Sequence, residues 1–312
     1  MDFIFERVKQ KNPDGSLNII GARGRYTIHG EKLFPEEELS HLDGHKGSKP
    51  VRIGNGAIDH VQLDIYGELM DCIYLGQKYG RPLGYDMWYV FILYMQLIIA
   101  ETFAKGGCQR TTSSLCAETQ ICLSGQEVRG KMKHFTYSKV MMWVAIDRGI
   151  RLAEKRSFPC PKRIQWLEAR DSLYEEIMEK AYNKELGFFG QSYEDVDVLD
   201  SSLCIMPLVF FSTPADPRFL NTLRRILLTP ERGGLTSNGL VYRYDVNKSD
   251  DGVGGEEGTF CLCTLWTVEA LGRAGEYDKG FLQRAVTMFE DFLQYTNHVG
   301  LCTEEISPAG DG

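Results

Sequence analysis

From residue 58 onward the sequence repeats one pattern, in which apolar residues recur at helical spacing and a loop rich in glycine or proline follows. In the segment 58–78 apolar residues stand four positions apart, so they share one face of an α-helix. Gly80 and Pro82 end this helix. The pattern predicts helices over 58–78, 85–103, 136–154, 163–183, 197–211, 217–228, 258–274 and 279–297.

More apolar helices alternate with more polar ones in this set. The helices that begin at 85, 136, 197 and 258 are the more apolar members. Inner and outer helices of layered α-hairpins show this alternation, which predicts an all-α fold of the α/α-toroid type. In such a fold the loops at one end of the inner helices line a single cavity. We therefore expect the chemistry in the polar loops 106–133, 233–258 and 300–312.

The first 57 residues differ from the rest because they are rich in glycine and charge and lack the helical period. A turn signal at Pro13 and a short alternating patch at 23–33 predict loops with one brief hairpin. We expect a loop-rich covering segment over 1–57 and a toroid domain over 58–312.

The charge balance argues against two classes of partner. A formal net charge of −8 does not suit nucleic acids or anionic membranes, which attract clustered lysine and arginine. The most apolar window, 88–100, is shorter than the roughly 20 residues of a membrane-spanning helix. A neutral, polar small molecule is the expected partner.

The cysteines and the first residues bear on location. The first 15 residues are charged and lack the apolar run of a secretory signal. The nine cysteines are an odd number without zinc-type spacing, so we interpret them as mostly reduced and buried. Cys261 and Cys263, in an apolar run, are expected to pack in the core. These observations favour a cytoplasmic protein without a metal site.

Each of the three polar loops carries a glutamate that could act as an acid or a base. Glu127 precedes the helix expected at 136, and Glu304 follows an apolar Leu301. Taken locally, Glu127 is typical of a solvated loop and Glu304 of an acidic tail. Glu256 and Glu257 in the middle loop compete equally for a catalytic role. Local sequence leaves these alternatives open.

The middle loop also carries Arg243 and Tyr244. A guanidinium offers a fork of hydrogen-bond donors and a tyrosine offers an aromatic face, and both suit the hydroxyl groups and ring of a sugar. The sequence has no glycine-rich phosphate loop ahead of a helix and no GxSxG elbow. A sugar is therefore a better candidate than a nucleotide or an ester.

Five segments stand out in this order along the chain: PVRIGNGAIDHVQLDIYGELMD, QEVRGKMKHFTYSKVMMWVAIDRGIRLA, GLVYRYD, EEGTFCLCTLWTVEALGRAG and GLCTEEISP. Together they resemble the catalytic domain of glycoside hydrolase family 15, in particular its trehalase and glucoamylase-like branch. The resemblance extends from Arg23 over nearly the whole chain. It implies an (α/α)6 barrel, incomplete at both ends, and inverting hydrolysis of terminal α-glucosidic bonds in trehalose or short α-glucans, without metal or cofactor.

The resemblance also implies roles for single residues. Glu127 matches the family's general acid and Glu304 its general base. Arg243, Tyr244 and Asp245 match the segment that contacts the sugar in the first subsite. Further matches near the same pocket are Arg52, Asn55, Gln62 and Asp64.

The chain also departs from the family's pattern. Gln126 stands where the family has a tryptophan, and His60 where it usually has a glutamine. The segment 105–126 differs from the family's lead-in to the acid, and fewer helices are expected than a closed ring of six hairpins contains. These departures motivate an alternative, a catalytically inactive, truncated toroid protein that only binds a sugar or a partner.

Overall fold

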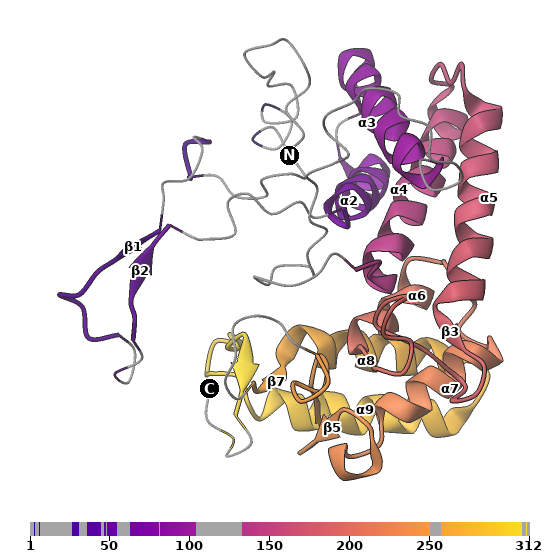
Figure 1. Ribbon diagram of the computed structural model, residues 1–312. Coiled ribbons are helices and arrows are strands. Elements are labelled where there is room, and N and C mark those ends of the chain that lie inside the picture. The colour runs from indigo at the N-terminus through magenta and orange to yellow at the C-terminus, as the bar shows by residue number, and fades with distance from the viewer. Residues whose placement is uncertain are drawn as a thin grey trace. The chain divides into compact units, whose positions relative to one another are not determined.

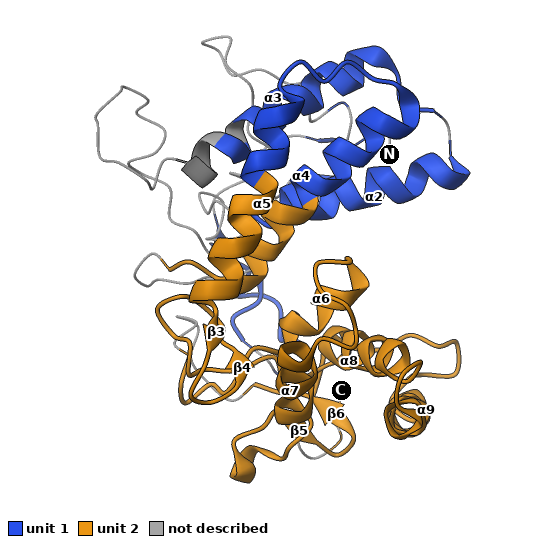
Figure 2. Ribbon diagram, turned by 90° about the vertical axis from the view of Figure 1, so that its right-hand side faces the viewer, with its two compact units in different colours: residues 1–132, 145–169 blue, residues 133–144, 170–312 orange. Residues whose placement is uncertain are grey.

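The computed structural model describes residues 3, 6, 27–30, 36–44, 47, 49–54, 63–80, 82–103, 133–249, 257–307 and 310 (Figure 1). Within these residues the chain is mainly helical, and each strand is only two residues long. The all-α prediction is confirmed. Two compact units are present, residues 1–132 with 145–169 and residues 133–144 with 170–312 (Figure 2). They are called unit 1 and unit 2 below.

Unit 1 is built mainly from helices. It contains α2 (Ile65–Tyr79), α3 (Tyr85–Phe103), the second part of α4 (Thr136–Arg156) and the first part of α5 (Arg163–Lys180). Its β1 (Glu37–Glu38) and β2 (Arg52–Ile53) pair antiparallel, with Glu37 opposite Ile53. The predicted boundary at residue 57 stays a prediction, because 55–62 lie outside the described residues.

The core of unit 1 is centred on Trp88, which is fully buried. Its ring stacks on Phe158 at 4.9 Å between centroids, and its Nε1 donates a hydrogen bond of 2.8 Å to the Pro159 carbonyl. Gly149 on α4 lets Met95 and Trp166 approach closely, since a Cβ there would lie 3.1 Å from the Met95 sulfur. Close packing of this kind fixes the helices of unit 1 on one another.

Helix α3 contains the most apolar window of the sequence, 88–100. Trp88, Phe91, Met95 and Ile98 of this helix are buried, whereas Tyr89 is exposed. Among the helices of the described residues, none combines the length and the apolar character that crossing a membrane requires.

Unit 2 combines the first part of α4 and the last part of α5 with shorter elements. In chain order these are β3 (Tyr182–Asn183), β4 (Phe188–Phe189), η4 (Ser201–Cys204), α6 (Ile205–Leu208), α7 (Pro217–Ile226), η5 (Pro230–Arg232), β5 (Thr236–Ser237), β6 (Leu240–Val241), β7 (Thr259–Phe260), α8 (Cys261–Ala274), α9 (Lys279–Leu293) and β8 (Glu305–Ile306). Strands pair antiparallel as β3 with β4, β5 with β6 and β7 with β8. Helices α8 and α9 pack on each other as a hairpin (Figure 1).

Side-chain caps set where several helices begin. Asp216 precedes α7 and accepts a hydrogen bond from the Arg218 backbone, and Asp278 precedes α9 and accepts one from Gly280. Pro217 occupies the first turn of α7, where no backbone donor is needed. These starts agree with the predicted ones, and α3 has the predicted bounds.

The helix predicted over 197–211 is wrong. Only η4 and the single turn of α6 form there. The Asp200 side chain accepts a hydrogen bond from the Ser202 backbone and so caps a new helical start, and Phe210 has a φ of 62° that no helix contains. Helix α5 ends at Lys180, before the predicted 183, because 182–183 form β3.

The packing predicts opposite effects for two glycine substitutions. A Cβ at Gly190 would lie 2.3 Å from the Val196 backbone, so Gly190→Ala is expected to destabilise the fold by about 1–3 kcal/mol. A Cβ at Gly272, inside α8, meets nothing within 4 Å, so Gly272→Ala is expected to stabilise it by about 0.5–1 kcal/mol. Urea unfolding followed by circular dichroism measures both, and equal midpoints for the two variants would contradict the packing at Gly190.

Candidate functional site

Loops far apart in the sequence meet in unit 2. Asp200 forms an isolated antiparallel bridge with Tyr244, and the Ser201 backbone donates a 2.8 Å hydrogen bond to the Arg243 carbonyl. Farther along the same loop, the Ser249 hydroxyl donates a hydrogen bond of 3.0 Å to the Gln191 side chain. The loop after β6 is thereby held against the segment that leads into η4.

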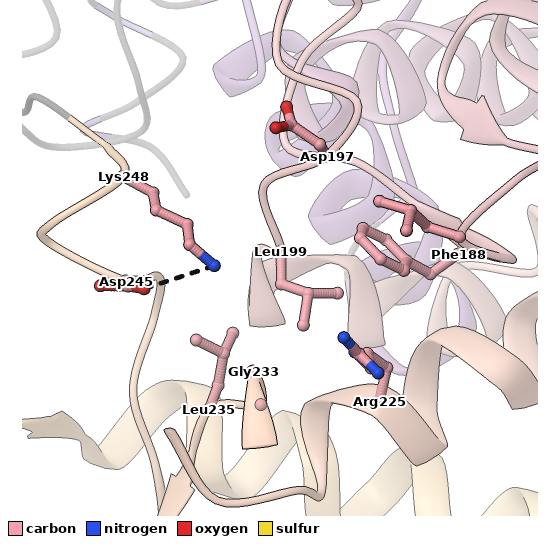
Figure 3. A pocket seen from close by; sticks show the side chains of 10 residues that line it. Phe188, Asp197, Leu199, Arg225, Gly233, Leu235, Asp245 and Lys248 are labelled. Carbon is pink, nitrogen blue, oxygen red and sulfur yellow. Dashed lines mark ion pairs between the residues drawn. The ribbon is translucent and has the colours of Figure 1, made fainter. Parts of the chain in front are cut away.

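Two pockets lie beside this loop. The first, called the tyrosine pocket, has a volume of about 280 Å³. It is lined by Pro230, Gly234, Leu235, Tyr242, Tyr244, Asp245, Val246, Asn247 and Glu257. The second, called the charged pocket, has a volume of about 240 Å³ and is drawn in Figure 3. It is lined by Leu186, Phe188, Asp197, Leu199, Arg225, Gly233, Gly234, Leu235, Asp245 and Lys248.

The two pockets share a wall made of Gly234, Leu235 and Asp245. Asp245 is held by its own turn, because its Oδ1 accepts a 3.0 Å hydrogen bond from the Asn247 backbone. Its Oδ2 lies 3.7 Å from the Lys248 ammonium, the ion pair marked in Figure 3. Asp245 therefore presents a fixed carboxylate between the pockets.

Arg243 directly precedes Tyr244 in the chain but lines neither pocket. It is 7% exposed, and the neighbouring Asp200 is 1% exposed. Its Nε lies 3.8 Å from the Asp200 Oδ1. Burial lowers the pKa of Arg243, but Asp200 foremost and then Cys263 raise it, so that the pKa stays above its usual value. The site thus contains a permanent, buried positive charge with a carboxylate beside it.

The predicted sugar-binding segment is only partly open to a ligand. Tyr244 and Asp245 line the tyrosine pocket, although the Tyr244 residue is mostly buried. Arg243 is buried and lines neither pocket. Tyr242 and Glu257 line the same pocket, and Glu256 lies outside the described residues.

Two adjacent glutamates occupy different environments at β8. Glu304 is exposed, and its backbone carbonyl accepts a 3.1 Å hydrogen bond from Cys261. Glu305 is half-buried, and its Oε2 accepts a 2.8 Å hydrogen bond from the Gly258 backbone. The Glu305 carboxylate thus holds the end of the middle loop, whereas the Glu304 carboxylate faces solvent.

The start of α4 is fastened to the segment 190–195. The Thr136 hydroxyl donates a 2.6 Å hydrogen bond to the Gly190 carbonyl, and the His134 backbone donates one of 2.8 Å to Glu194. The His134 ring stacks on Tyr193 at 5.6 Å between centroids. His134 therefore packs against this segment and anchors the start of α4. These contacts fix the residues that follow the loop expected to carry Glu127.

The other predicted site residues lie outside the described residues or in unit 1. Glu127, Asn55 and Gln62 lie outside the described residues. Arg52 on β2 forms an ion pair of 2.7 Å with Glu36 in unit 1. Asp64, also in unit 1, is buried immediately before α2. Among the described residues, no group of three or more histidine, cysteine, aspartate or glutamate side chains could hold a metal ion.

Sequence reasoning missed Asp200, because that residue fell inside a helix predicted over 197–211. The signal that could have found it is the sequence Asp-Ser-Ser, since aspartate favours the position just before a helix. It also missed the charged pocket, whose charged residues come from helix α7 (Arg225), from the segment after β4 (Asp197) and from the loop after β6 (Asp245 and Lys248).

Comparison with known proteins identifies a family. The model of the family described as "Glycosyl hydrolases family 15" matches residues 21–308. A trehalase of Mycobacterium tuberculosis is 37% identical over 91% of this chain and 37% of its own length. A trehalase of Thermoplasma acidophilum is 31% identical over 90% of this chain and 43% of its own length. The chain therefore spans less than half the length of these curated relatives.

Solved structures share the fold. A wild-type glycosidase superposes with a TM-score of 0.59 at 16% identity, over 86% of this chain and 65% of its own. A glycosidase variant solved in complex with glucose superposes with a TM-score of 0.58 at 15% identity, over the same shares of the two chains. These similarities assign the helical fold of the glycosidases to this chain.

The burial of the thiols around Arg243 predicts their reactivity. Burial raises the pKa of Cys263 to about 11 and that of Cys204 to about 12, whereas Cys72 and Cys302 are exposed. The thiolate is the reactive form, so iodoacetamide at pH 8 should alkylate Cys72 and Cys302 and spare the other two. Peptide mass mapping of native and urea-unfolded protein measures this. Alkylation of Cys263 at the rate of Cys302 in the native protein would contradict the described core.

Proposed function

Because the chain belongs to glycosyl hydrolase family 15, we propose that it hydrolyses terminal α-glucosidic bonds. The observation that carries the proposal is the tyrosine pocket of unit 2. Its lining combines Tyr242 and Tyr244 with Asp245, Asn247 and Glu257. Aromatic faces and a few convergent polar groups suit a sugar ring with its hydroxyl groups.

We propose trehalose as the preferred substrate and short α-glucans as the second. The curated relatives are trehalases, and a glycosidase of the same fold has been solved with glucose. Both substrates present a terminal glucosyl unit, so one pocket for a glucose ring serves either. The bond preference then depends on how the second sugar is held.

The proposed mechanism uses two carboxyl groups and inverts the anomeric configuration. Glu127 donates its proton to the oxygen of the breaking bond, and Glu304 removes a proton from the attacking water. The bond from the anomeric carbon to the leaving sugar breaks as the bond to the water oxygen forms on the opposite face, which releases β-glucose. This chemistry needs the two groups about 6.5–9.5 Å apart, so that a water molecule fits between them.

The environment of β8 supports Glu304 over its neighbour as the base. A general base must reach water, and the Glu304 side chain is exposed. The Glu305 carboxylate instead accepts the hydrogen bond from Gly258. Glu257 is the competing candidate, because its side chain lines the tyrosine pocket.

The remaining site predictions are proposals of the same kind. Arg243, Tyr244 and Asp245 would bind the glucosyl unit in unit 2, and Arg52, Asn55, Gln62 and Asp64 are proposed as further substrate-binding residues. The division into a covering segment, 1–57, and a toroid domain, 58–312, is proposed with them.

We also propose a cytoplasmic location. The six cysteines within the described ranges are unpaired. Free thiols are usual in reducing compartments, whereas secreted proteins tend to pair them.

The test is glucose release by the purified chain from trehalose, maltose and maltotriose. Glu127→Gln and Glu304→Gln are each expected to lower kcat by about 10²–10⁴-fold, because each removes a proton-transfer group. Glu305→Gln is the matched neighbour: its amide oxygen still accepts from Gly258, so glucose release should stay close to that of the unsubstituted chain. Proton NMR during hydrolysis of maltotriose should show β-glucose first, whereas trehalose should give one β-glucose and one α-glucose, because its leaving unit keeps the α configuration.

Four outcomes would count against parts of the proposal. Unchanged kcat in Glu304→Gln would remove it as the base, and a large loss of kcat in Glu257→Gln alone would transfer that role. Initial release of α-glucose from maltotriose, or of α-glucose alone from trehalose, would exclude inversion. A folded chain that binds glucose but releases none would favour the non-catalytic alternative. The sequence feature that motivates this alternative is Gln126, which stands before the proposed acid where the family has a tryptophan.

A further inference from the structure

We propose that Asp200 is a positioning residue that holds the Arg243 guanidinium in place for sugar binding, an inference that rests on the proposed function. The juxtaposition is direct, since the Arg243 Nε lies 3.8 Å from the Asp200 Oδ1. No pattern in the sequence predicts that Asp200 and Arg243 are in contact. Asp200 itself lines neither pocket.

Contacts other than the ion pair with Arg243 hold the Asp200 carboxylate in place. Its Oδ1 accepts a 2.8 Å hydrogen bond from the Ser202 backbone at the start of η4. The bridge between Asp200 and Tyr244 and the hydrogen bond from Ser201 to the Arg243 carbonyl set the register of the two segments. Asp200 therefore presents its charge at one position relative to the 243–244 backbone.

The charge of Arg243 needs this partner because both side chains are buried. A buried ionised group is costly unless an opposite charge or hydrogen bonds compensate it. Cys263 and Tyr137 also act on Arg243, but burial keeps the Cys263 thiol protonated at neutral pH by raising its pKa to about 11. Asp200 therefore contributes a negative charge that compensates Arg243.

This arrangement has a consequence for the tyrosine pocket. Arg243 directly precedes Tyr244 and Asp245, which line the pocket. If the guanidinium loses this counter-charge, it must turn toward water or admit water into its buried site. The backbone beside the pocket is then expected to shift with it. We expect the affinity for the sugar to fall, with the fold kept.

Asp200→Asn is the sharpest variant. Asparagine caps a helix start as well as aspartate does, so the hydrogen bond from Ser202 survives while the charge is lost. The expected result is a KM for trehalose, and a Kd for glucose measured by calorimetry, that rise by roughly tenfold or more with kcat changed little. A merely structural role would lower the melting temperature and the active fraction, and leave KM unchanged.

Asp216→Asn is the matched control. Asp216 also caps a helix, by accepting from the Arg218 backbone at 2.8 Å, and its Oδ2 pairs with the Arg218 guanidinium at 2.8 Å. It lines neither pocket. The two variants remove the same charge from the same kind of cap, so KM and Kd should change only in Asp200→Asn.

A double substitution tests whether Asp200 acts through Arg243. Arg243→Gln is expected to raise KM and Kd as well, and Asp200→Asn added to it should raise them no further. Additive effects, or an Asp200→Asn protein with KM and Kd within twofold of the unsubstituted values, would overturn the inference. Should Asp200→Asn fail to fold, Asp200→Ser, which keeps a cap, gives the same comparison.

The two proposals can fail separately. A chain that binds glucose in a manner dependent on Asp200 but releases none from any substrate disproves the hydrolytic function and supports the positioning role. A chain that hydrolyses trehalose with a KM indifferent to Asp200 disproves the positioning role and supports the function.

Discussion

Pairing between backbone segments far apart in the sequence gives unit 2 its site. The chain there has short helices and long loops, and loops that meet in an interior must satisfy their amide and carbonyl groups. They do so in pairs: Asp200 with Tyr244, and β7 with β8, where Thr259 lies opposite Ile306. Each contact is only one or two residues long, yet each joins segments more than 40 positions apart. Pockets form beside these paired segments because the helices alone do not fill the space between the loops.

Two buried arginines of the described residues differ in how a carboxylate contacts them. In unit 1, Arg148 donates to Asp71 at 2.6 Å and to Asp147 at 2.7 Å, so two carboxylates hold it within the helical core. In unit 2, the Arg243 Nε lies 3.8 Å from the Asp200 Oδ1, a longer ion pair between two loop segments. Charged hydrogen bonds as short as those of Arg148 are the stronger ones, so its two carboxylates hold the guanidinium more firmly than the ion pair alone holds that of Arg243.

The helical spacing of apolar residues predicted the features of the fold that depend on that spacing. The bounds of α3 and the start of α7 follow from apolar spacing and caps, and so did the all-α class. The helix over 197–211 failed because Asp200 bonds to the local backbone instead of continuing a helix. The joint between Asp200 and Tyr244 could not be predicted, since nothing in either segment specifies a partner 44 positions away. Arg243 and Tyr244 were proposed from their side-chain chemistry and, together with Asp245, from the family resemblance, but the pockets beside this segment were not predicted.

The neighbouring glutamates at β8 show how register decides chemistry. Successive side chains of an extended segment point to opposite sides, so Glu304 and Glu305 cannot face the same space. The pairing of Phe260 with Glu305 turns the Glu305 carboxylate toward Gly258 and leaves that of Glu304 in solvent. A shift of one residue in this pairing would exchange the two environments. The proposal of Glu304 as the base therefore depends on two residues of strand pairing, and the Thr259 hydroxyl, which donates to the Ile306 carbonyl at 3.1 Å, helps to hold that register.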